Sequence, residues 1–154
     1  IDLHVLSALA KRFQVSFEAL CIRFIKFTTQ RAILVYWDNG FVKYEWRSSS
    51  AVKTRARIRR TDDPQEPLPG TLAADSTVEQ EWDGTEMSAA IWCPEEAPHM
   101  KLREFKHSYT TGDRVLTLLL LESAEPRSWD RSWQDGESFD SFDQFVSNGQ
   151  LPVR

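Results

Sequence analysis

The chain has few of the residues on which disulfide frameworks, paired metal sites and phosphate-binding loops depend. It contains two cysteines, three histidines and six glycines in 154 residues. Two cysteines are too few for a disulfide framework, and the histidines show no H-E-x-x-H or other paired metal spacing. The scattered glycines form no phosphate-binding loop, and no G-x-S-x-G motif marks a nucleophile. We therefore expect no catalytic residue and no metal-binding residue in this chain.

Long apolar runs are missing as well. The longest strongly apolar stretch covers residues 115–121, whereas a membrane-spanning helix needs ~20 such residues. The apolar surroundings of Cys21 in the sequence predict a buried free thiol, which agrees with a reducing compartment. We expect no membrane partner and a cytoplasmic location.

Four residues of the chain leave one alternative for a metal site. Cys93, His99 and His107 could meet around zinc with Glu104 as a fourth ligand, although their spacing matches no zinc pattern. Ordinary surface histidines are the simpler interpretation, and we expect no cofactor in this chain.

The chain does have a marked division of charge. Residues 1–60 contain 12 Lys and Arg against 4 Asp and Glu, a balance of +8. Residues 61–154 contain 7 against 19, a balance of −12. This asymmetry indicates either a nucleic-acid or acidic partner for the first part, or basic and acidic halves that face one another within the fold.

Residues 6–24 predict two short amphipathic helices joined by a turn at residues 14–16. Apolar residues recur at helical spacing on both sides of that turn: Leu3, Leu6, Leu9, Ala10 and Phe13, then Phe17, Leu20, Cys21, Phe24 and Ile25. Asp2 and Ser16 stand where helix N-caps belong. The outline is that of a helix-turn-helix. Because the chain opens on Ile1 directly against this motif, we expect it to be part of a longer protein.

The next residues predict an antiparallel sheet. Asp38-Asn39-Gly40 lies between β-branched and aromatic runs, which indicates a hairpin with strands over 32–37 and 41–46. In the second strand Val42, Tyr44 and Trp46 are expected on one buried face. A second hairpin is predicted over residues 101–122, and its apolar run at 116–121 is typical of a central strand covered on both faces.

Other segments give less regular patterns. Alternation predicts a strand with a cationic face over residues 51–60, and a strand is also expected over 87–92. Prolines predict a loop over 62–70, and residues 71–80 allow a short helix. The expected fold is α+β, with a helix pair over 1–30, an antiparallel sheet domain over 31–123 and an acidic aromatic tail over 124–154. In that tail Phe139, Phe142, Phe145 and Val146 could line a short helix.

Two kinds of binding residue can be named from these patterns. Candidates for DNA or phosphate contact are Arg23, Lys26, Lys53, Arg55, Arg57 and Arg59. Candidates for a small-ligand pocket are Trp82, Trp92 and Tyr109. The simpler alternatives are a solvated basic surface for the first set and an ordinary sheet core for the second.

The helix pair and the following hairpin resemble the region after the zinc-binding domain in ImmA/IrrE-type metallopeptidases. Val15-Ser16, Glu18-Ala19-Leu20 and Arg23 stand where that family has a segment of the form la..f.VS.eal..Rl. The D-N-G turn, Ser48–Ser50 and the segments 102–104 and 116–119 then follow in the family's order.

The resemblance implies a helix-turn-helix-like connector followed by a GAF-like or PAS-like sensor domain. In that family a zinc peptidase cleaves a repressor protein and so relieves transcriptional repression under stress. Its H-E-x-x-H motif and its zinc would lie before Ile1, so no catalytic residue carries over to this chain. We therefore expect a noncatalytic regulatory portion of a bacterial zinc metallopeptidase, with a repressor protein as partner and a small molecule as signal. The alternative is a DNA-binding transcriptional regulator with a fused ligand-sensing domain.

Overall fold

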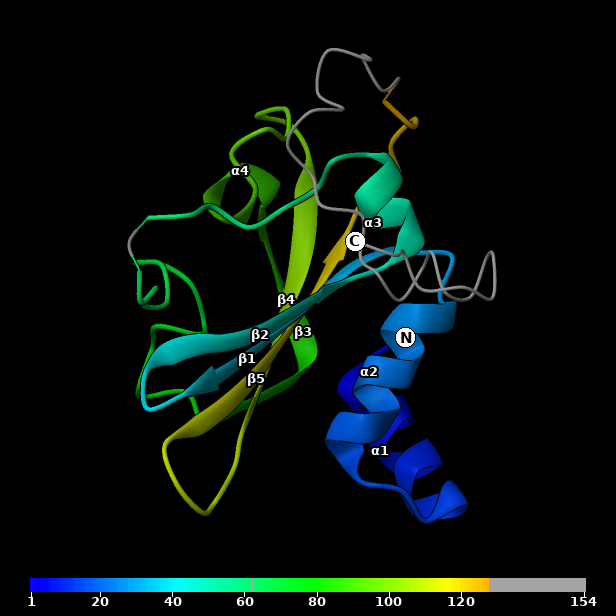
Figure 1. Cartoon of the computed structure of the whole chain (residues 1–154), viewed down its shortest axis with the longest axis vertical. Helices are drawn as coiled ribbons and strands as arrows, with labels where there is room; N and C mark the ends of the chain where they lie inside the picture. The colour runs from blue at the N-terminus through cyan, green and yellow to red at the C-terminus, as the bar shows by residue number, and fades with distance from the viewer. Residues whose placement is uncertain (62, 128–154) are drawn as a thin grey trace, which may run out of the picture.

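In a computed structural model, residues 1–61 and 63–127 of the chain are described. Helices α1 (Leu3–Phe13) and α2 (Phe17–Phe27) precede a five-stranded antiparallel sheet (Figure 1). The strands are β1 (Arg31–Asp38), β2 (Phe41–Arg47), β3 (Gln80–Ser88), β4 (Lys101–Ser108) and β5 (Arg114–Leu121), in the spatial order β2-β1-β5-β4-β3. The short helices α3 (Ser49–Lys53) and α4 (Ala89–Trp92) follow β2 and β3. The predicted α+β class is confirmed.

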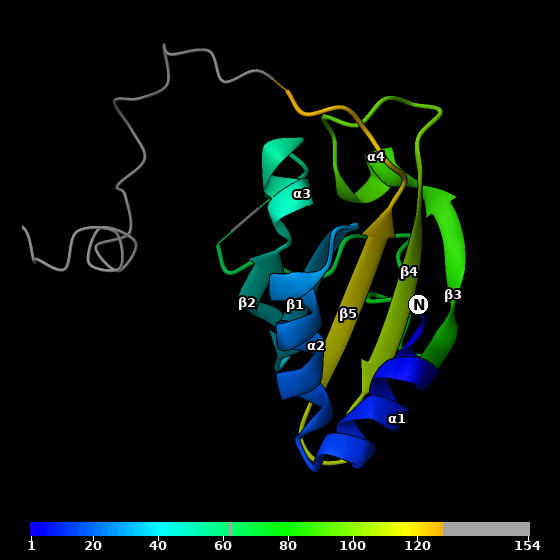
Figure 2. The ribbon, with the colours of Figure 1, turned by 90° about the vertical axis from the view of Figure 1, so that its right-hand side faces the viewer.

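The sheet carries a hydrophobic core on each of its two faces. Successive side chains of a strand point to opposite sides, so β1 places Ala32, Leu34 and Tyr36 in one core and Ile33, Val35 and Trp37 in the other. The first face, here called the helix face, is covered by α1 and α2. The second, the loop face, is covered by α3, α4 and apolar residues of the segment 54–79. Figure 2 shows α1 beside β3 and β4 and α2 beside β1.

The helix pair forms where the sequence predicts it. Asp2 caps α1 by accepting a hydrogen bond from the Val5 N–H at 2.9 Å, and Ser16 caps α2 by accepting one from Ala19 at 3.1 Å. Gln14, in the left-handed region with φ 53°, ends α1. The buried apolar residues of the two helices share one core with the sheet, so the pair packs on the sheet directly. Among the described helices, none combines the length and apolar character that crossing a membrane requires.

Both predicted hairpins are confirmed, with one difference in β2. The β1–β2 register shifts between Tyr36 and Trp37, which leaves Lys43 as an extra residue. This bulge directs Val42 to the loop face, whereas Trp46 packs in the core of the helix face. The expectation that Val42, Tyr44 and Trp46 share one buried face is therefore wrong, because a one-residue insertion reverses the alternation.

Residues 51–60 do not form the predicted strand. Ser48 caps α3 by accepting a hydrogen bond from the Ala51 N–H at 3.2 Å, and Arg55 then turns the chain with φ 58°. The alternation itself is real, because Ala56 and Ile58 are buried in the loop-face core while Arg57 and Arg59 are exposed. The segment buries alternate residues against the sheet without pairing to a strand.

The second region of difference lies before β4. No helix forms within residues 71–80; β3 begins at Gln80, and the predicted strand over 87–92 is divided between the end of β3 and helix α4. The Ala89 N–H donates to the Met100 carbonyl and Cys93 N–H to the Ala89 carbonyl, which closes this helical turn. The helix considered for Phe139, Phe142, Phe145 and Val146 lies outside the described residues.

Candidate functional site

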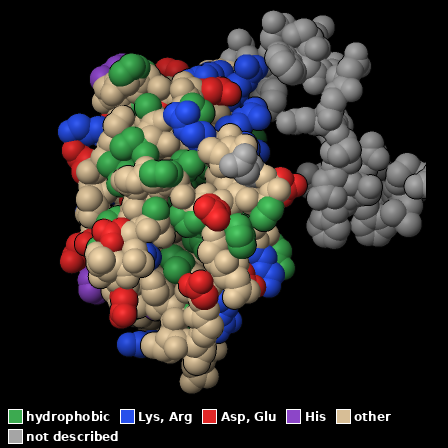
Figure 3. Space-filling view, turned by 90° about the vertical axis from the view of Figure 1, so that its left-hand side faces the viewer, with side chains coloured by type: hydrophobic (Ala, Val, Ile, Leu, Met, Phe, Trp, Pro, Cys, Tyr) green, Lys and Arg blue, Asp and Glu red, His purple; other side chains and the backbone are tan. Residues whose placement is uncertain are grey.

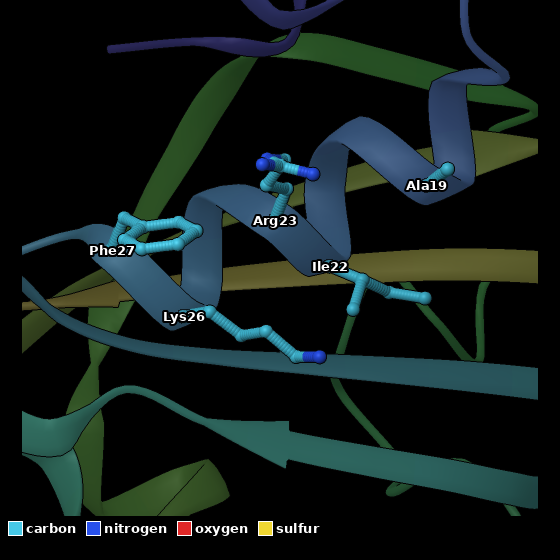
Figure 4. A pocket seen from close by; sticks show the side chains of 5 residues that line it. All are labelled: Ala19, Ile22, Arg23, Lys26 and Phe27. Carbon is cyan, nitrogen blue, oxygen red and sulfur yellow. The ribbon is translucent and has the colours of Figure 1, made fainter.

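The cationic residues predicted to contact DNA lie in two places. Arg23 and Lys26 line a shallow pocket on the exposed side of α2, together with Ala19, Ile22 and Phe27. In Figure 4, Ile22 and Lys26 project toward one side of the helix and Arg23 and Phe27 toward the other. The Arg23 guanidinium lies 5.7 Å from the centre of the Phe27 ring, and that ring is 74% exposed.

The other four predicted contacts lie on or after α3, on the side of the loop face. Lys53, Arg57 and Arg59 are exposed, while Arg55 is half-buried. Arg59 donates a hydrogen bond to the Ala90 carbonyl at 3.2 Å, which ties it to α4. Figure 3 shows Lys and Arg side chains gathered toward the top of this side of the molecule. The six predicted residues therefore do not form one continuous row.

Arg57 belongs to a groove along the edge strand β2. The groove has a volume of about 480 Å³, and its lining residues are Val42, Lys43, Tyr44, Glu45, Arg47, Arg57 and Arg60. We call it the β2-edge groove. Three of its cations, Lys43, Arg47 and Arg60, were not predicted as contacts, because they come from two segments that only the fold brings together. The available signal in the sequence was the alternation of charged residues, Lys43, Glu45 and Arg47, along β2.

Glu45 organises the cations of this groove. Its side chain is 11% exposed, and its carboxylate lies 2.6 Å from an Arg60 nitrogen and 4.0 Å from Arg47 Nε. Lys43 pairs with Asp38 at 3.0 Å, and this hydrogen bond raises the pKa of the Lys43 ammonium. Arg57 has no hydrogen-bond or ion-pair partner among the described residues. The groove therefore holds an excess of positive charge.

The residues predicted to line a ligand pocket are divided by the sheet. Trp82 and Tyr109 pack on the helix face, whereas Trp92 is fully buried in the core of the loop face. The rings of Trp92 and Trp37 pack at a tilt of 53° with their centres 6.2 Å apart, and the Trp92 indole N–H donates to Glu104 Oε2 at 3.1 Å. Trp92 thus fills the core, and the three residues do not line one cavity.

Trp82 and Tyr109 instead take part in a group of rings between the helix pair and the sheet. We call His4, Phe17, Trp82, His107 and Tyr109 the aromatic cluster. Phe17 of α2 stacks on Trp82 of β3 with centres 5.8 Å apart and meets the edge of His107 of β4 at 4.9 Å. His4 of α1 contacts Trp82 at 5.2 Å, and Tyr109 contacts His107 at 4.7 Å. The cluster joins both helices to one end of the sheet.

Gln80 fixes the orientation of two rings in the aromatic cluster. Its Nε2 donates to the Ser108 carbonyl at 2.8 Å, so its Oε1 is the atom that faces Trp82 Nε1 at 2.9 Å and His107 Nδ1 at 2.8 Å. Because Oε1 only accepts, His107 Nδ1 must carry a hydrogen. Burial lowers the pKa of His107, which favours the neutral ring at neutral pH.

Two ionisable groups are buried beneath the loop face. Glu104 accepts hydrogen bonds from the Ala73 N–H at 2.8 Å and from Trp92, and burial raises the pKa of its carboxyl. Lys106 donates to the Asp75 carbonyl at 2.6 Å, and burial lowers the pKa of its ammonium. Both groups hold the segment 71–79 against β4, which is a structural role.

The described residues bring together no group of three His, Cys, Asp or Glu side chains that could hold a metal ion. Of the four residues considered for zinc, Cys93 is buried, and burial raises the pKa of its thiol to about 12. Glu104 is already occupied by its two donors. Cys21 is likewise a buried free thiol, as the sequence predicted, and burial raises its pKa to about 12.

Comparison with models of known protein families gives no match for this chain, and a search among curated proteins gives none.

Proposed function

We propose that this chain is the noncatalytic regulatory portion of a bacterial ImmA/IrrE-type zinc peptidase, which relieves transcriptional repression by cleaving a repressor protein. The sheet, as a GAF-like or PAS-like sensor, receives a small-molecule or protein signal. The helix pair transmits it or positions the repressor. The catalytic zinc would belong to a peptidase domain upstream of this chain. The proposal draws on the ordered resemblance between residues 6–24, the D-N-G hairpin and the later strands.

One structural observation supports a regulatory role more than any other. Phe17 of α2 lies against both Trp82 of β3 and His107 of β4, while His4 of α1 contacts the same tryptophan. A displacement of β3 therefore changes contacts with both helices at once, and a displacement of β4 changes the contact with α2. Packed cores favour discrete arrangements over gradual deformation, which suits this interface to a two-state signal.

The reading frame that encodes this chain gives the first test. It should encode an H-E-x-x-H helix upstream of Ile1, and a frame without one would contradict the proposal. The second test uses the full protein in its own cells, with repressor cleavage measured before and after stress. Phe17→Ala should weaken the dependence of cleavage on stress, because it removes the shared contact of α2 with β3 and β4. Phe13→Ala is the matched control, since Phe13 is 63% exposed at the end of α1. Equal responses of wild type and Phe17→Ala would count against coupling through this cluster.

An alternative function, DNA binding, rests on the exposed cations. Arg23 and Lys26 lie on α2, which is the second helix of the pair, and Arg57 lies in a separate place, the β2-edge groove. This function predicts a mobility shift of mixed-sequence duplex DNA that weakens steeply with salt. Neutralising Arg23, Lys26, Arg55 and Arg57 together should abolish the shift. A wild-type chain that shifts no duplex at low salt would exclude it.

A further inference from the structure

We propose that the β2-edge groove is a binding site for phosphate groups. It lies on the edge strand β2 and on the segment after α3. The inference adds a site to the proposed function without depending on it, because it concerns groups that take no part in the aromatic cluster contacts of Phe17.

The groove contains more positive charge than its own carboxylates can neutralise. Lys43, Arg47, Arg57 and Arg60 line it, and Glu45 is its one lining carboxylate among the described residues. Asp38 pairs with Lys43 from outside the lining. Four positive charges and these two negative ones leave a balance of +2, which equals the charge of a fully ionised phosphate group with the opposite sign.

Glu45 fixes the positions of two arginine side chains in the groove, as an anion-binding site requires. Its carboxylate is shielded from water and lies near both Arg47 and Arg60, so it holds two guanidinium groups close together. Arg47 is further positioned by donating to the Ala56 carbonyl at 3.5 Å. A guanidinium has five N–H donors, so the donors that Glu45 and Ala56 do not use remain available to a ligand.

Arg57 is the groove cation whose N–H donors are most available to a ligand. Its side chain is exposed at the groove and has no hydrogen-bond or ion-pair partner within the described parts of the chain. The planar fork of a guanidinium matches the oxygens of phosphate and can bind them in a bidentate way. The volume of about 480 Å³ lies within the usual range of small-ligand sites. A phosphorylated small molecule and a nucleic-acid strand present the same chemical group to these cations.

The test is calorimetric titration of the 154-residue chain with sodium pyrophosphate, a short oligothymidylate and polyglutamate. The titrations are made at ~50 and ~200 mM salt, a range over which phosphate contacts weaken strongly. We expect saturable binding of pyrophosphate or oligothymidylate. Arg57→Ala should weaken it about tenfold or more, since a charge-assisted hydrogen bond is lost. Arg57→Lys keeps the charge but loses the planar fork of the guanidinium, so its affinity should lie between those of wild type and Arg57→Ala.

Lys53→Ala is the matched control, because Lys53 is an exposed cation of the same part of the chain that does not line the groove. It should leave the affinity unchanged. Tight, steeply salt-dependent binding of oligothymidylate would support the site and identify a nucleic-acid strand as the source of phosphate. Comparable affinities for the two phosphate probes would support the site and indicate a small phosphorylated ligand. The proposal is overturned if neither phosphate probe binds, if polyglutamate binds as tightly, or if Lys53→Ala weakens binding as much as Arg57→Ala.

Discussion

Arg31 and Glu96 form an ion pair inside the molecule, with each side chain only 4% exposed. The Arg31 guanidinium donates to Glu96 Oε1, to the Thr54 hydroxyl at 2.8 Å and to the Glu122 carbonyl at 2.7 Å. One side chain at the start of β1 therefore connects the end of α3, the loop after α4 and the segment after β5. It also joins the basic first part of the chain to the acidic second part.

Removing the charge of Glu96 should destabilise the fold strongly. Glu96→Gln leaves the buried guanidinium without a counter-ion, and loss of one partner of a buried pair typically lowers the free energy of unfolding by about 3–5 kcal/mol. Urea denaturation followed by circular dichroism measures the change. The control is Glu86→Gln, because Glu86 pairs with Lys101 at 2.6 Å while both side chains are more than half exposed. It should change stability little. Similar losses in the two variants would show that burial does not matter at Arg31.

Glu104 should give the folded chain a characteristic pH dependence. Burial raises the pKa of its carboxyl above the ordinary value of 4.5, so the folded state binds this proton more tightly than the unfolded state does. The stability linked to that proton is present below the ordinary pKa and is lost as the pH rises through the raised pKa. The free energy of unfolding of wild type relative to Glu104→Gln should therefore fall with rising pH from about 4.5 upward.

The Glu104→Gln variant should also show a loss that does not depend on pH. Both carboxylate oxygens accept hydrogen bonds, from Ala73 and Trp92, and an amide group can accept only one of them. The unsatisfied donor should lower the free energy of unfolding by about 1–3 kcal/mol. Denaturation of both proteins over a pH series separates the two effects, and a difference that stays constant across the series would refute the raised pKa.

Gly84 should tolerate no side chain, because β3 approaches β4 too closely at its bulge. A Cβ atom at this position would lie 2.6 Å from the Phe105 ring, and the backbone φ is +85°. Gly84→Ala should lower the free energy of unfolding by about 1–3 kcal/mol through overpacking, in addition to the backbone strain. Gly70→Ala is the matched control, with φ +83° and no atom within 4 Å of the added Cβ. The difference between the two variants in thermal and urea denaturation isolates the contact with Phe105. Equal effects would mean that backbone strain alone restricts this position.

Phe17 and Trp82 should show an interaction energy of their own. Their rings stack at 5.8 Å, and stacked pairs contribute about 0.5–1.5 kcal/mol beyond the area that they bury. A double-mutant cycle with Phe17→Ala and Trp82→Ala measures this term as the departure from additivity. A cycle that pairs Trp82 with exposed Phe27 should be additive. Additivity in both cycles would remove the contact on which the proposed coupling of helices and sheet rests.

Much of the fold could be predicted because its signals are local. Asp2 and Ser16 cap helices within three residues of themselves, and the Asn39-Gly40 turn is enclosed by its own two strands. The apolar run of β5 indicated a central strand, which the strand order confirms. The strand predicted over residues 51–60 was wrong because its signal was not local. The alternation there reflects burial of Ala56 and Ile58 against a sheet face, and alternation alone does not distinguish such burial from pairing in a ladder.

The candidate site was less predictable than the fold. Arg57 was predicted from its charge. The other cations that line its groove, Lys43, Arg47 and Arg60, come near it only because the fold places β2 beside the segment after α3. Trp82, Trp92 and Tyr109 were predicted to line a ligand pocket or to fill the sheet core, but the sequence contains no information on which side of the sheet each one lies. A single bulge at Lys43 is enough to exchange the faces of neighbouring residues.

The sequence by itself determined the two capped helices, the two hairpins and the α+β class, because these depend on hydrogen bonds and periodicities between residues close together in the chain. Tertiary structure alone decided the burial of Arg31 with Glu96, the gathering of Phe17, Trp82 and His107, and the cations around Glu45. These depend on contacts between residues far apart in the chain, whose formation requires the sheet order, the bulge and the close approach at Gly84.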